Sequence, residues 1–375
     1  MASTLLSPGV EIQERDLAIG SIETVEVNVG AIAGAFSKGP VLKPVRIANE
    51  SQLIEVFGEP TDGNATTWWT AASFLQYGGV LDVVRVSTSG QLTASDDNVT
   101  SPYTLSIPTV EVYEATYAGA SSNPWKWAAR TPGADANAIK VAIIDKGADI
   151  TLSLDGALTT STVGTQVQTA SGSPNGAKSG FIYEWDSVNN KVSLITSDTW
   201  TTTDVIENGV TDLNVTAKSD WYDSQVAYGN VNWNTIAPRP GTSPFVAERG
   251  GANDEMHVIV YDATGVISGT PNTLLEKFTY VSKANNAKTA SGAVNYYPTV
   301  IQDKSAFVYW GSHENDAYDV SANAAITSGA NFGGTNNKGS DSTTTFDLFS
   351  SDSNNRSYTF VKGAETLAAT SDNII

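Results

Sequence analysis

The 375-residue sequence contains no cysteine and only two histidines, and each scarcity excludes a class of chemistry. Without cysteine there is no disulfide framework, no thiolate metal site and no cysteine nucleophile. A chain without disulfides suits folding in a reducing cytoplasm. Because histidine is the commonest general base and metal ligand, two copies leave little material for either role.

Positive charge and long hydrophobic runs are also scarce. Lys and Arg number 21 against 40 Asp and Glu, so the formal net charge is −19. Such a surface repels phosphate backbones and anionic headgroups, and we therefore expect no nucleic-acid partner. No run approaches the roughly 18 apolar residues of a membrane-spanning helix, so we expect no membrane insertion. The first residues lack the basic region and apolar core of a signal peptide.

What is present is enough apolar material for several cores, since 40% of the residues are hydrophobic. The length indicates two or three domains. We expect a mixed, multidomain α+β fold, with an α/β core unit and a large β-rich inserted domain. The predicted divisions are an extended N-terminal arm (1–21), an α/β core domain (22–87), a β-rich protruding or inserted region (88–254) and an α/β segment that returns to the middle domain (255–375).

The stretch from Asn49 to Ser87 predicts the α/β unit around which the chain is organised. Asn49 is a typical N-cap, and Gln52 stands three residues later, as in a capping box. A second helix is expected from about Ala65 to the Gly78-Gly79 pair, followed by a buried strand from Leu81. The apolar face of this second helix is expected to comprise Trp68, Trp69, Ala72 and Leu75.

Two further strands are expected before this unit, at Ile22–Asn28 and Val41–Ile47. Between them, the small residues of Gly30–Gly34 predict close backbone packing. A phosphate-binding loop would need a Lys-Ser or Lys-Thr pair and a following helix, and neither is present.

The region after Ser87 reads mostly as β structure. Alternation predicts strands at Ser101–Tyr117, Ile139–Ile144 and Ile150–Leu154, and the last runs into an Asp155-Gly156 hairpin turn. The Thr-, Ser- and Asn-rich segment from Thr159 to Arg249 predicts an all-β module without a long helix. Its expected strands are 181–185, 192–195 and 221–228, with a hairpin turn at Asn189-Asn190.

The α/β pattern returns after residue 255. Glu255–Tyr261 predicts a core strand, and Thr273–Ala284 predicts an amphipathic helix. Asn295–Asp303 predicts a short helix and Phe307–Trp310 a final strand. The apolar face of the amphipathic helix is expected to comprise Leu274, Leu275, Phe278 and Val281.

No constellation of residues predicts catalysis, a cofactor site or a metal site. His257 lies inside an apolar strand, where a satisfied core histidine is the expected role, and His313 stands beside Glu314 and Asp316 in a polar loop. Trp125 and Trp127 could stack on sugars or bases, but buried core positions are favoured. The acidic stretch 347–356 does not meet the EF-hand pattern, and the metalloprotease, nucleophile-elbow and nucleotide-binding motifs are absent.

Several segments, in order, resemble the contractile tail sheath proteins of myoviruses, especially those of the T-even type. The opening Leu5–Glu11 is similar to the SPGVE start of that family, and residues 33–40 resemble its next segment. Residues 49–87 combine a short helix, an FG-P turn, an aromatic helix ending FLQYGG and a VVRV strand. Residues 129–141 resemble the strand entry PG…N-(I/L)-KV, and residues 255–311 resemble the corresponding T-even segment.

The resemblance implies a structural function without a cofactor. The chain would be a subunit of the sheath that surrounds the tail tube and contracts to drive it through the host envelope. Its implied partners are other copies of itself, the tail tube protein, and the baseplate and tail terminator proteins. Its implied location is the virion, after assembly in the bacterial host cytoplasm. Sheath proteins of this family continue further, so the resemblance also implies that the C-terminal sheath domain is missing from this chain.

The N-terminal arm is the candidate for linkage between subunits. Its composition fits either a loosely packed terminus or an extended strand added to a neighbour, and the resemblance favours the strand. Two other functions stay open: a β-rich surface adhesin or glycan-binding module carried by residues 159–249, and a hydrolase that uses acidic residues. The arm residues expected to link subunits are Leu5, Leu6, Pro8, Gly9, Val10, Ile12, Leu17 and Ile19.

Overall fold

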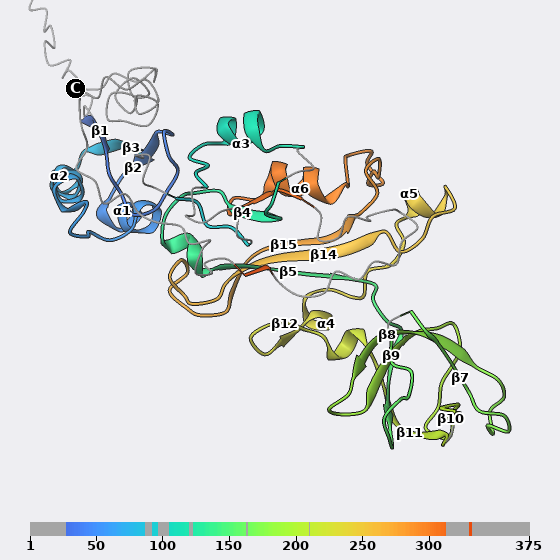
Figure 1. Ribbon diagram of the computed structural model, residues 1–375. Helices are drawn as coiled ribbons and strands as arrows, with labels where there is room; N and C mark the ends of the chain where they lie inside the picture. Colours follow the sequence, from blue (N-terminus) through green and yellow to red (C-terminus); the bar gives the residue numbers. More distant parts are fainter. Residues whose placement is uncertain are drawn as a thin grey trace, which may run out of the picture.

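The computed structural model describes residues 28–86, 92–96, 105–119, 123–162, 164–209 and 211–312, together with the backbone of residues 330–331. Figure 1 shows an elongated molecule with three bodies in a row. An N-terminal α/β unit lies at one end, a middle domain built on a long sheet follows, and a β-rich body lies at the other end. The fold is therefore mixed α and β, with several separate sheets, as the sequence predicts.

The N-terminal unit (residues 29–86) is a three-stranded sheet packed against two helices. Its elements are β1 (Val29–Gly34), β2 (Val45–Ile47), α1 (Glu50–Phe57), α2 (Ala65–Gln76) and β3 (Val80–Arg85). Strand β3 lies in the centre, parallel to β1 and antiparallel to β2. A parallel pair needs a long crossover connection, and the segment carrying α1 and α2 supplies it. The core of this unit includes Ile47, Leu53, Phe57, Trp68, Leu75 and Val83.

The predicted capping of α1 is confirmed. Asn49 accepts a hydrogen bond from the backbone N–H of Gln52 at 2.9 Å, and the Gln52 side chain accepts one from the N–H of Ala48 at 2.9 Å. Gly58 ends the helix with a φ of 84°, a conformation that glycine adopts without strain. The side-chain hydrogen bonds of Asn49 and Gln52 thus fix the start of α1, and Gly58 fixes its end.

The expected apolar face of α2 needs one correction. Trp68, Ala72 and Leu75 are buried as predicted, but Trp69 is 54% exposed. The buried stripe comprises Trp68, Ala71, Ala72 and Leu75, and at about 100° per residue Trp69 falls outside its edge. The Trp68 indole N–H donates to the carbonyl of Gly58 at 2.8 Å, which anchors the buried ring.

The small residues of β1 allow α2 to lie close to the sheet, as expected. A Cβ atom at Gly30 would lie 2.6 Å from the Phe74 ring, and one at Gly34 would lie 2.4 Å from Thr67. Of the other strands expected nearby, Ile22–Asn28 falls almost wholly outside the described residues. Only the last three residues of the predicted Val41–Ile47 strand form β2.

The middle domain is built on an antiparallel sheet with the order β15-β14-β5-β17. The predicted strands Ile139–Ile144 and Glu255–Tyr261 are confirmed as β5 and β14, which pair along their full length. One face carries a core that includes Val141, Val258 and Ile301. The remaining elements are β4 (Trp127–Ala129), η1 (Asp135–Ala138), β5 (Ile139–Asp145), β14 (Glu255–Asp262), β15 (Thr273–Ser282), α6 (Tyr297–Lys304), β16 (Val308–Trp310) and β17 (Ala330–Asn331).

The helix predicted at Thr273–Ala284 is wrong, because this segment is strand β15. Its ladder with β14 shifts register twice, so β15 holds extra residues opposite β14. Leu275, Phe278 and Val281 all pack against the same core, although they are spaced by three residues. An extra residue in a strand moves later side chains to the opposite face, so bulges can imitate helical spacing.

The strand predicted at Ser101–Tyr117 is also wrong within the described residues. Helix α3 (Val110–Thr116) occupies its second half, and Thr109 caps this helix by accepting from the Val112 N–H. Tyr113 is the buried residue of the helix and stacks on Tyr309 with ring centroids 4.2 Å apart. One buried ring with exposed neighbours is sufficient for a short capped helix, whereas a strand would bury every second residue.

The β-rich body is a six-stranded antiparallel sheet with the order β10-β11-β6-β9-β8-β7. Its outer strands also meet, because Thr169 bridges to Ile206 and the Ala170 N–H donates to the Val205 carbonyl at 2.8 Å. The sheet thereby closes into a small barrel (residues 150–220), and closure removes exposed strand edges. The strands are β6 (Ile150–Leu154), β7 (Gln166–Gln168), β8 (Ser179–Asp186), β9 (Lys191–Ile195), β10 (Val205–Ile206) and β11 (Leu213–Asp220).

The turn at Asn189-Asn190 is confirmed, since β8 and β9 form a hairpin there and Asn190 has a φ of 51°. The hairpin predicted at Asp155-Gly156 is wrong, because β6 pairs with β9 and β11 rather than with the next strand. The interior is filled by side chains from all six strands and by the buried Trp200. The barrel stands between β5 and β14 in the sequence, although these two strands are neighbours in the middle sheet.

The predicted strand 221–228 is half correct. Residues Tyr222–Ser224 form the 3-10 turn η2, and only the end of the segment is a strand. This strand pairs with a short partner in the segment between the middle sheet and the barrel (Figure 1), and both lead into two short helices. The four elements are β12 (Val226–Tyr228), β13 (Val231–Asn232), α4 (Trp233–Ile236) and α5 (Pro244–Ala247).

Candidate functional site

His257 is a structural residue, as the sequence predicts. Its ring is fully buried, and its Nε2 lies 2.8 Å from the carbonyl of Pro238. The backbone N–H of Tyr280 donates to Nδ1 at 3.0 Å, so Nε2 carries the proton. Burial lowers the pKa of His257. A neutral imidazole held on both sides has no free atom for substrate or metal.

The tryptophans that could have stacked on a ligand are buried. Trp125 and Trp127 are 0% and 1% exposed, so they belong to the core. His313 and the acidic stretch 347–356 lie outside the described residues. Within the described ranges there is no group of three or more His, Cys, Asp or Glu side chains that could hold a metal ion. The same part of the chain contains no helix long and apolar enough to cross a membrane.

The buried carboxylates have structural partners: Asp262 binds the backbone of a loop, and Asp145 forms an ion pair. Asp262 accepts hydrogen bonds from the backbone N–H groups of Gly265, Ile267 and Ser268, which outweigh burial and lower its pKa. Asp145 lies 3.2 Å from the Lys283 ammonium, and burial raises the pKa of that carboxyl. These arrangements resemble caps and structural ion pairs more than the paired acid and base of a hydrolase.

The junction between the N-terminal unit and the middle domain is fastened by Arg85. This side chain is fully buried at the end of β3. Its guanidinium donates to the carbonyls of Phe36 (2.9 Å), Ser37 (3.1 Å) and Gly39 (2.8 Å), and to that of Pro132 at 2.8 Å. The first three acceptors belong to the N-terminal unit, and the last belongs to the segment that leads into β5. A single cation therefore connects the two bodies through backbone oxygens.

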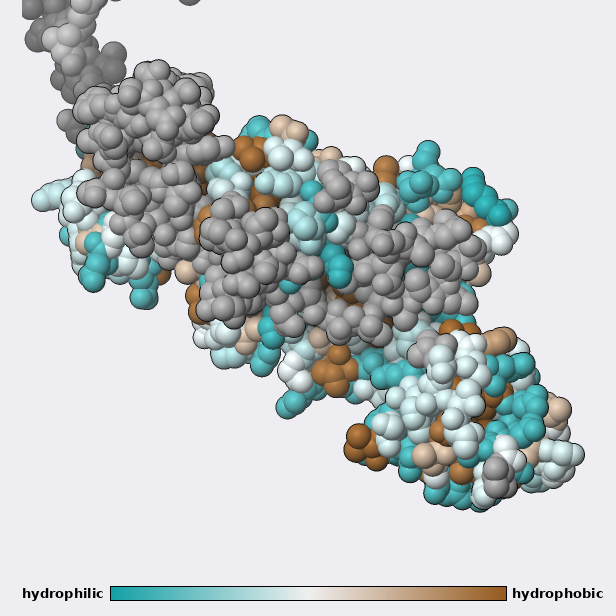
Figure 2. Space-filling view, viewed as in Figure 1, coloured by the Kyte–Doolittle hydropathy of each residue, from teal (hydrophilic) through white to brown (hydrophobic). Residues whose placement is uncertain are grey.

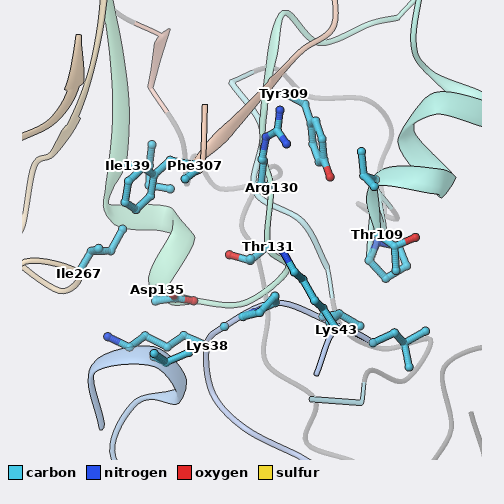
Figure 3. A pocket seen from close by; sticks show the side chains of 18 of the residues that line it. Lys38, Lys43, Thr109, Arg130, Thr131, Asp135, Ile139, Ile267, Phe307 and Tyr309 are labelled. Atoms are coloured by element: carbon cyan, nitrogen blue, oxygen red, sulfur yellow. The ribbon is translucent and has the colours of Figure 1, made fainter. Parts of the chain in front are cut away.

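An open groove of about 1290 Å³ lies beside this junction (Figure 3). Lys38, Lys43 and Val56 line it from the N-terminal unit, and Asp135 and Phe307 line it from the middle domain. Mixed charges and an apolar floor are usual for a gap between two bodies. The geometry shows a joint between domains, without a set of convergent groups that would define a ligand.

Arg130 forms a second fixed point on the middle-domain wall of the groove. Its guanidinium lies 4.7 Å from the centre of the Tyr309 ring, and Figure 3 shows the two side by side. It donates to the carbonyls of Val308 and Gln302. Arg130 thus ties α6 to β16 rather than reaching across to the N-terminal unit.

Large exposed hydrophobic side chains occur at both ends of the molecule. Trp69 is 54% exposed and Tyr77 is 90% exposed in the N-terminal unit, while Phe181 and Val188 are exposed on the barrel. Figure 2 shows one face, on which hydrophobic residues lie in small separate patches among hydrophilic ones. Surface aromatic residues of this kind are typical of contact sites between proteins.

The arm residues that the sequence assigns to subunit linkage lie outside the described residues. Their role stays a prediction. They are Leu5, Leu6, Pro8, Gly9, Val10, Ile12, Leu17 and Ile19.

Comparison with known proteins matches residues 29–86 to the family model "Tail sheath protein Gp18 domain III N-terminal region". These residues are the N-terminal unit defined above. The chain is related to the phage tail sheath proteins. The predicted resemblance is therefore confirmed.

Individual curated relatives of this chain are also named tail sheath proteins. The tail sheath protein of Vibrio phage KVP40 is 40% identical over 83 residues, which are 22% of this chain and 12% of that protein. The tail sheath protein of Enterobacteria phage T4 is 39% identical over 82 residues, again 22% and 12%. That of Salmonella phage ViI is 27% identical over 333 residues, 81% of this chain and 49% of the relative. The chain thus matches about half or less of the length of these relatives.

A solved structure of the sheath tail protein Lin1278 from Listeria innocua was also matched, at 12% identity and a TM-score of 0.19. The match covers 55% of this chain and 34% of that chain. A score this low carries no argument about the fold.

The sequence did not reveal two features that the structure makes prominent. Arg85 looked like one charged residue in a VVRV strand, and its acceptors are backbone atoms that leave no mark in a sequence. The closure of the barrel depends on pairing between strands almost 40 residues apart, at Thr169 and Ile206. Trp69 could have been recognised as exposed, because it lies one position outside the stripe formed by Trp68, Ala72 and Leu75.

Proposed function

We propose that this chain acts as a structural subunit of a contractile tail sheath. The observation that carries the proposal is the alignment over 81% of the chain with the ViI tail sheath protein, together with the family match of the N-terminal unit. Copies of the subunit surround a tail tube, in contact with baseplate and terminator proteins. They assemble in the host cytoplasm and remain in the virion. Contraction drives the tube through the host envelope.

The proposed mechanism is mechanical and uses no catalytic group or cofactor. Subunits move as nearly rigid bodies from an extended lattice to a shorter and wider one. The arm of residues 1–21 links neighbours by adding a strand, so that they stay joined while other contacts change. Removing the first 20 residues from the full-length protein tests this link. Sheaths that still assemble and contract normally would contradict the role of the arm.

Within this subunit, we assign the outward-facing part to the barrel. The barrel is inserted between two strands that are neighbours in the middle sheet, so it adds to the middle domain without interrupting it. We propose residues 150–220 as the inserted domain, which lie inside the predicted β-rich region 88–254. The predicted domain boundaries otherwise stay as proposals.

Immunogold labelling of the virion tests the sheath function. Antibodies against the isolated barrel sequence would be applied to particles of the phage that encodes the chain. We expect label along the whole tail shaft, and along the shortened shaft after contraction. Label confined to the tail tip or fibres would refute the sheath role and favour an adhesin.

A glycan-binding screen of the full chain provides the second test. The adhesin alternative gains no support from the relatives, all of which are named tail sheath proteins. We expect no saturable glycan binding. Binding that depends on the exposed Phe181 of the barrel would revive the alternative.

A further inference from the structure

The longest stretch without a charged residue in the N-terminal unit runs from Gly63 to Leu81 and includes all of α2. The helix buries Trp68, Ala71, Ala72 and Leu75 against the sheet. Its opposite side is exposed, uncharged and aromatic. This surface, the α2 face, comprises Thr66, Trp69, Thr70, Ser73, Gln76 and Tyr77.

The two other described helices that have at least eight residues, α1 and α6, carry charged residues, whereas α2 carries none. Helix α1 carries Glu50 and Glu55, and helix α6 carries Asp303 and Lys304. Charged residues on the exposed side are the usual composition of a helix that stays in water. The uncharged exposed side of α2 differs from those of α1 and α6, and this composition is the one expected of a surface that is buried in a contact.

The two aromatic side chains are suited to anchoring a contact. Trp69 is 54% exposed, and its ring packs edge-on against Trp68 with the ring centroids 5.0 Å apart. Tyr77 is 90% exposed just after the end of α2. Trp and Tyr are the residues most enriched among binding hot spots. Together they offer roughly 200–350 Å² of aromatic surface, since a side chain of this type presents about 150–250 Å² when fully exposed.

That area is smaller than a complete interface. A stable pair buries about 800 Å² on each partner, so the α2 face anchors a larger contact or contributes one of several contacts in a lattice. An isolated contact of this size is weak, and it gains strength when each subunit has several neighbours.

We propose that the α2 face docks on a second copy of this chain. The charge supports this choice of occupant. Two copies that each carry a net charge of −19 repel one another, and a surface without carboxylates is where they can approach closely. This inference rests on the proposed sheath function, because a sheath is made of copies of one subunit.

The contact is heterologous, so the α2 face of one copy meets a different surface of the next. Two α2 faces packed against each other would close a two-fold pair and stop growth. Repetition of a heterologous contact continues along or around a tube. The α2 face lies at one end of the elongated molecule, where it can meet a neighbour without hindrance from the barrel at the other end.

Photo-crosslinking of the full chain tests the inference. The photoreactive amino acid p-benzoylphenylalanine would replace Trp69, Tyr77 or, as the matched control, Val188, which is 87% exposed on the barrel. The three proteins would be irradiated over a concentration series, and covalent dimers would be mapped by mass spectrometry. We expect dimers from both α2-face positions at concentrations at least tenfold below those needed at the control position. The partner peptide should lie outside α2.

Charge substitutions supply an independent readout. Trp69→Lys and Tyr77→Lys each place a cation in the α2 face, whereas Val188→Lys does so on the barrel. Sedimentation velocity should show at least a tenfold weaker self-association for the first two and no change for the third. Because Trp69 touches Trp68, unfolding curves are compared first, and the highly exposed Tyr77 retains the test if Trp69→Lys affects folding.

The outcomes separate this inference from the proposed function. Dimers that form through the control position, or self-association unchanged by both α2-face substitutions, would overturn the α2 contact and leave the sheath function intact. Mapping of the crosslink to α2 itself would overturn the heterologous arrangement. Absence of dimers from all three positions, at every concentration, would overturn the contact, and the sheath function would still be decided by the immunogold labelling.

Discussion

Replacing Arg85 with methionine should loosen the junction between the N-terminal unit and the middle domain. Methionine keeps an unbranched apolar stem but removes the guanidinium. Four backbone carbonyls then lose a charged donor, and those of Phe36 and Pro132 are the buried ones. The carbonyls of Ser37 and Gly39 are partly buried, so water can replace some of their hydrogen bonds.

The magnitude follows from the two buried acceptors. Hydrogen bonds to a charged donor contribute about 1.5–3 kcal/mol each, and a buried acceptor left without a donor costs about 1–3 kcal/mol. Counting only the two buried carbonyls gives about 3–6 kcal/mol of lost stability, which overlaps the ~3–5 kcal/mol cost of breaking a buried ion pair. In a domain-wise unfolding curve, this loss should lower the midpoint of the N-terminal unit more than that of the barrel.

Hydrogen exchange combined with thermal unfolding provides the assay. Exchange should accelerate in residues 36–44 and 130–134 of the Arg85→Met protein, with barrel residues unchanged. The control is Arg249→Met, because Arg249 is exposed and donates only locally, to the carbonyl of Phe245 in the short helix that precedes it. The control should cost less than about 1 kcal/mol. An Arg85→Met protein that unfolds and exchanges like the control would refute the reasoning.

Three further predictions concern pH, packing and backbone conformation. Burial lowers the pKa of His257, so the unfolded chain gains a proton at this residue below about pH 6.5 before the folded protein does. The free energy of unfolding should therefore decline from pH 7 to pH 5. His257→Gln should flatten this part of a plot of melting temperature against pH. Trp200→Ala should cost the barrel about 3–5 kcal/mol in denaturant unfolding, because the ring is fully buried, and should leave exchange in the N-terminal unit unchanged. Gly147→Ala should destabilise far more than Gly164→Ala in the same measurement: both glycines have positive φ, but a Cβ at Gly147 would lie 2.1 Å from Trp221, whereas at Gly164 it meets nothing within 4 Å.

The sequence predicts local structure well where signals are local. The cap at Asn49, the stop at Gly58 and the turn at Asn190 each depend on residues a few positions apart, and each is confirmed. Strand β15 was predicted wrongly because its structure depends on a distant partner strand. Its two register shifts place Leu275 and Phe278 on one core at helical spacing, and the pairing with β14 decides between helix and strand.

The functional interpretation depends less on secondary structure. The residues that carried the resemblance include Asn49–Ser87, and the family model covers residues 29–86, which contain all of this stretch except Ser87. By contrast, the candidate linkage residues precede the described part of the chain. The Arg85 junction could not be predicted, because contacts between domains are set by how distant segments meet.

The two junctions of the subunit differ in physical character, and this difference suggests where the subunit can bend. The base of the barrel is joined to the middle sheet by a buried apolar cluster that includes Trp221, Tyr222 and Ile259. The N-terminal unit is joined by directional hydrogen bonds from Arg85 and is flanked by an open groove. Apolar burial resists separation in every direction, whereas a junction held by directional hydrogen bonds beside an open groove opens at lower free energy. Relative movement within a subunit is therefore expected at Arg85 before it occurs at the barrel, so that wild-type exchange should be faster in residues 36–44 than in residues 221–228.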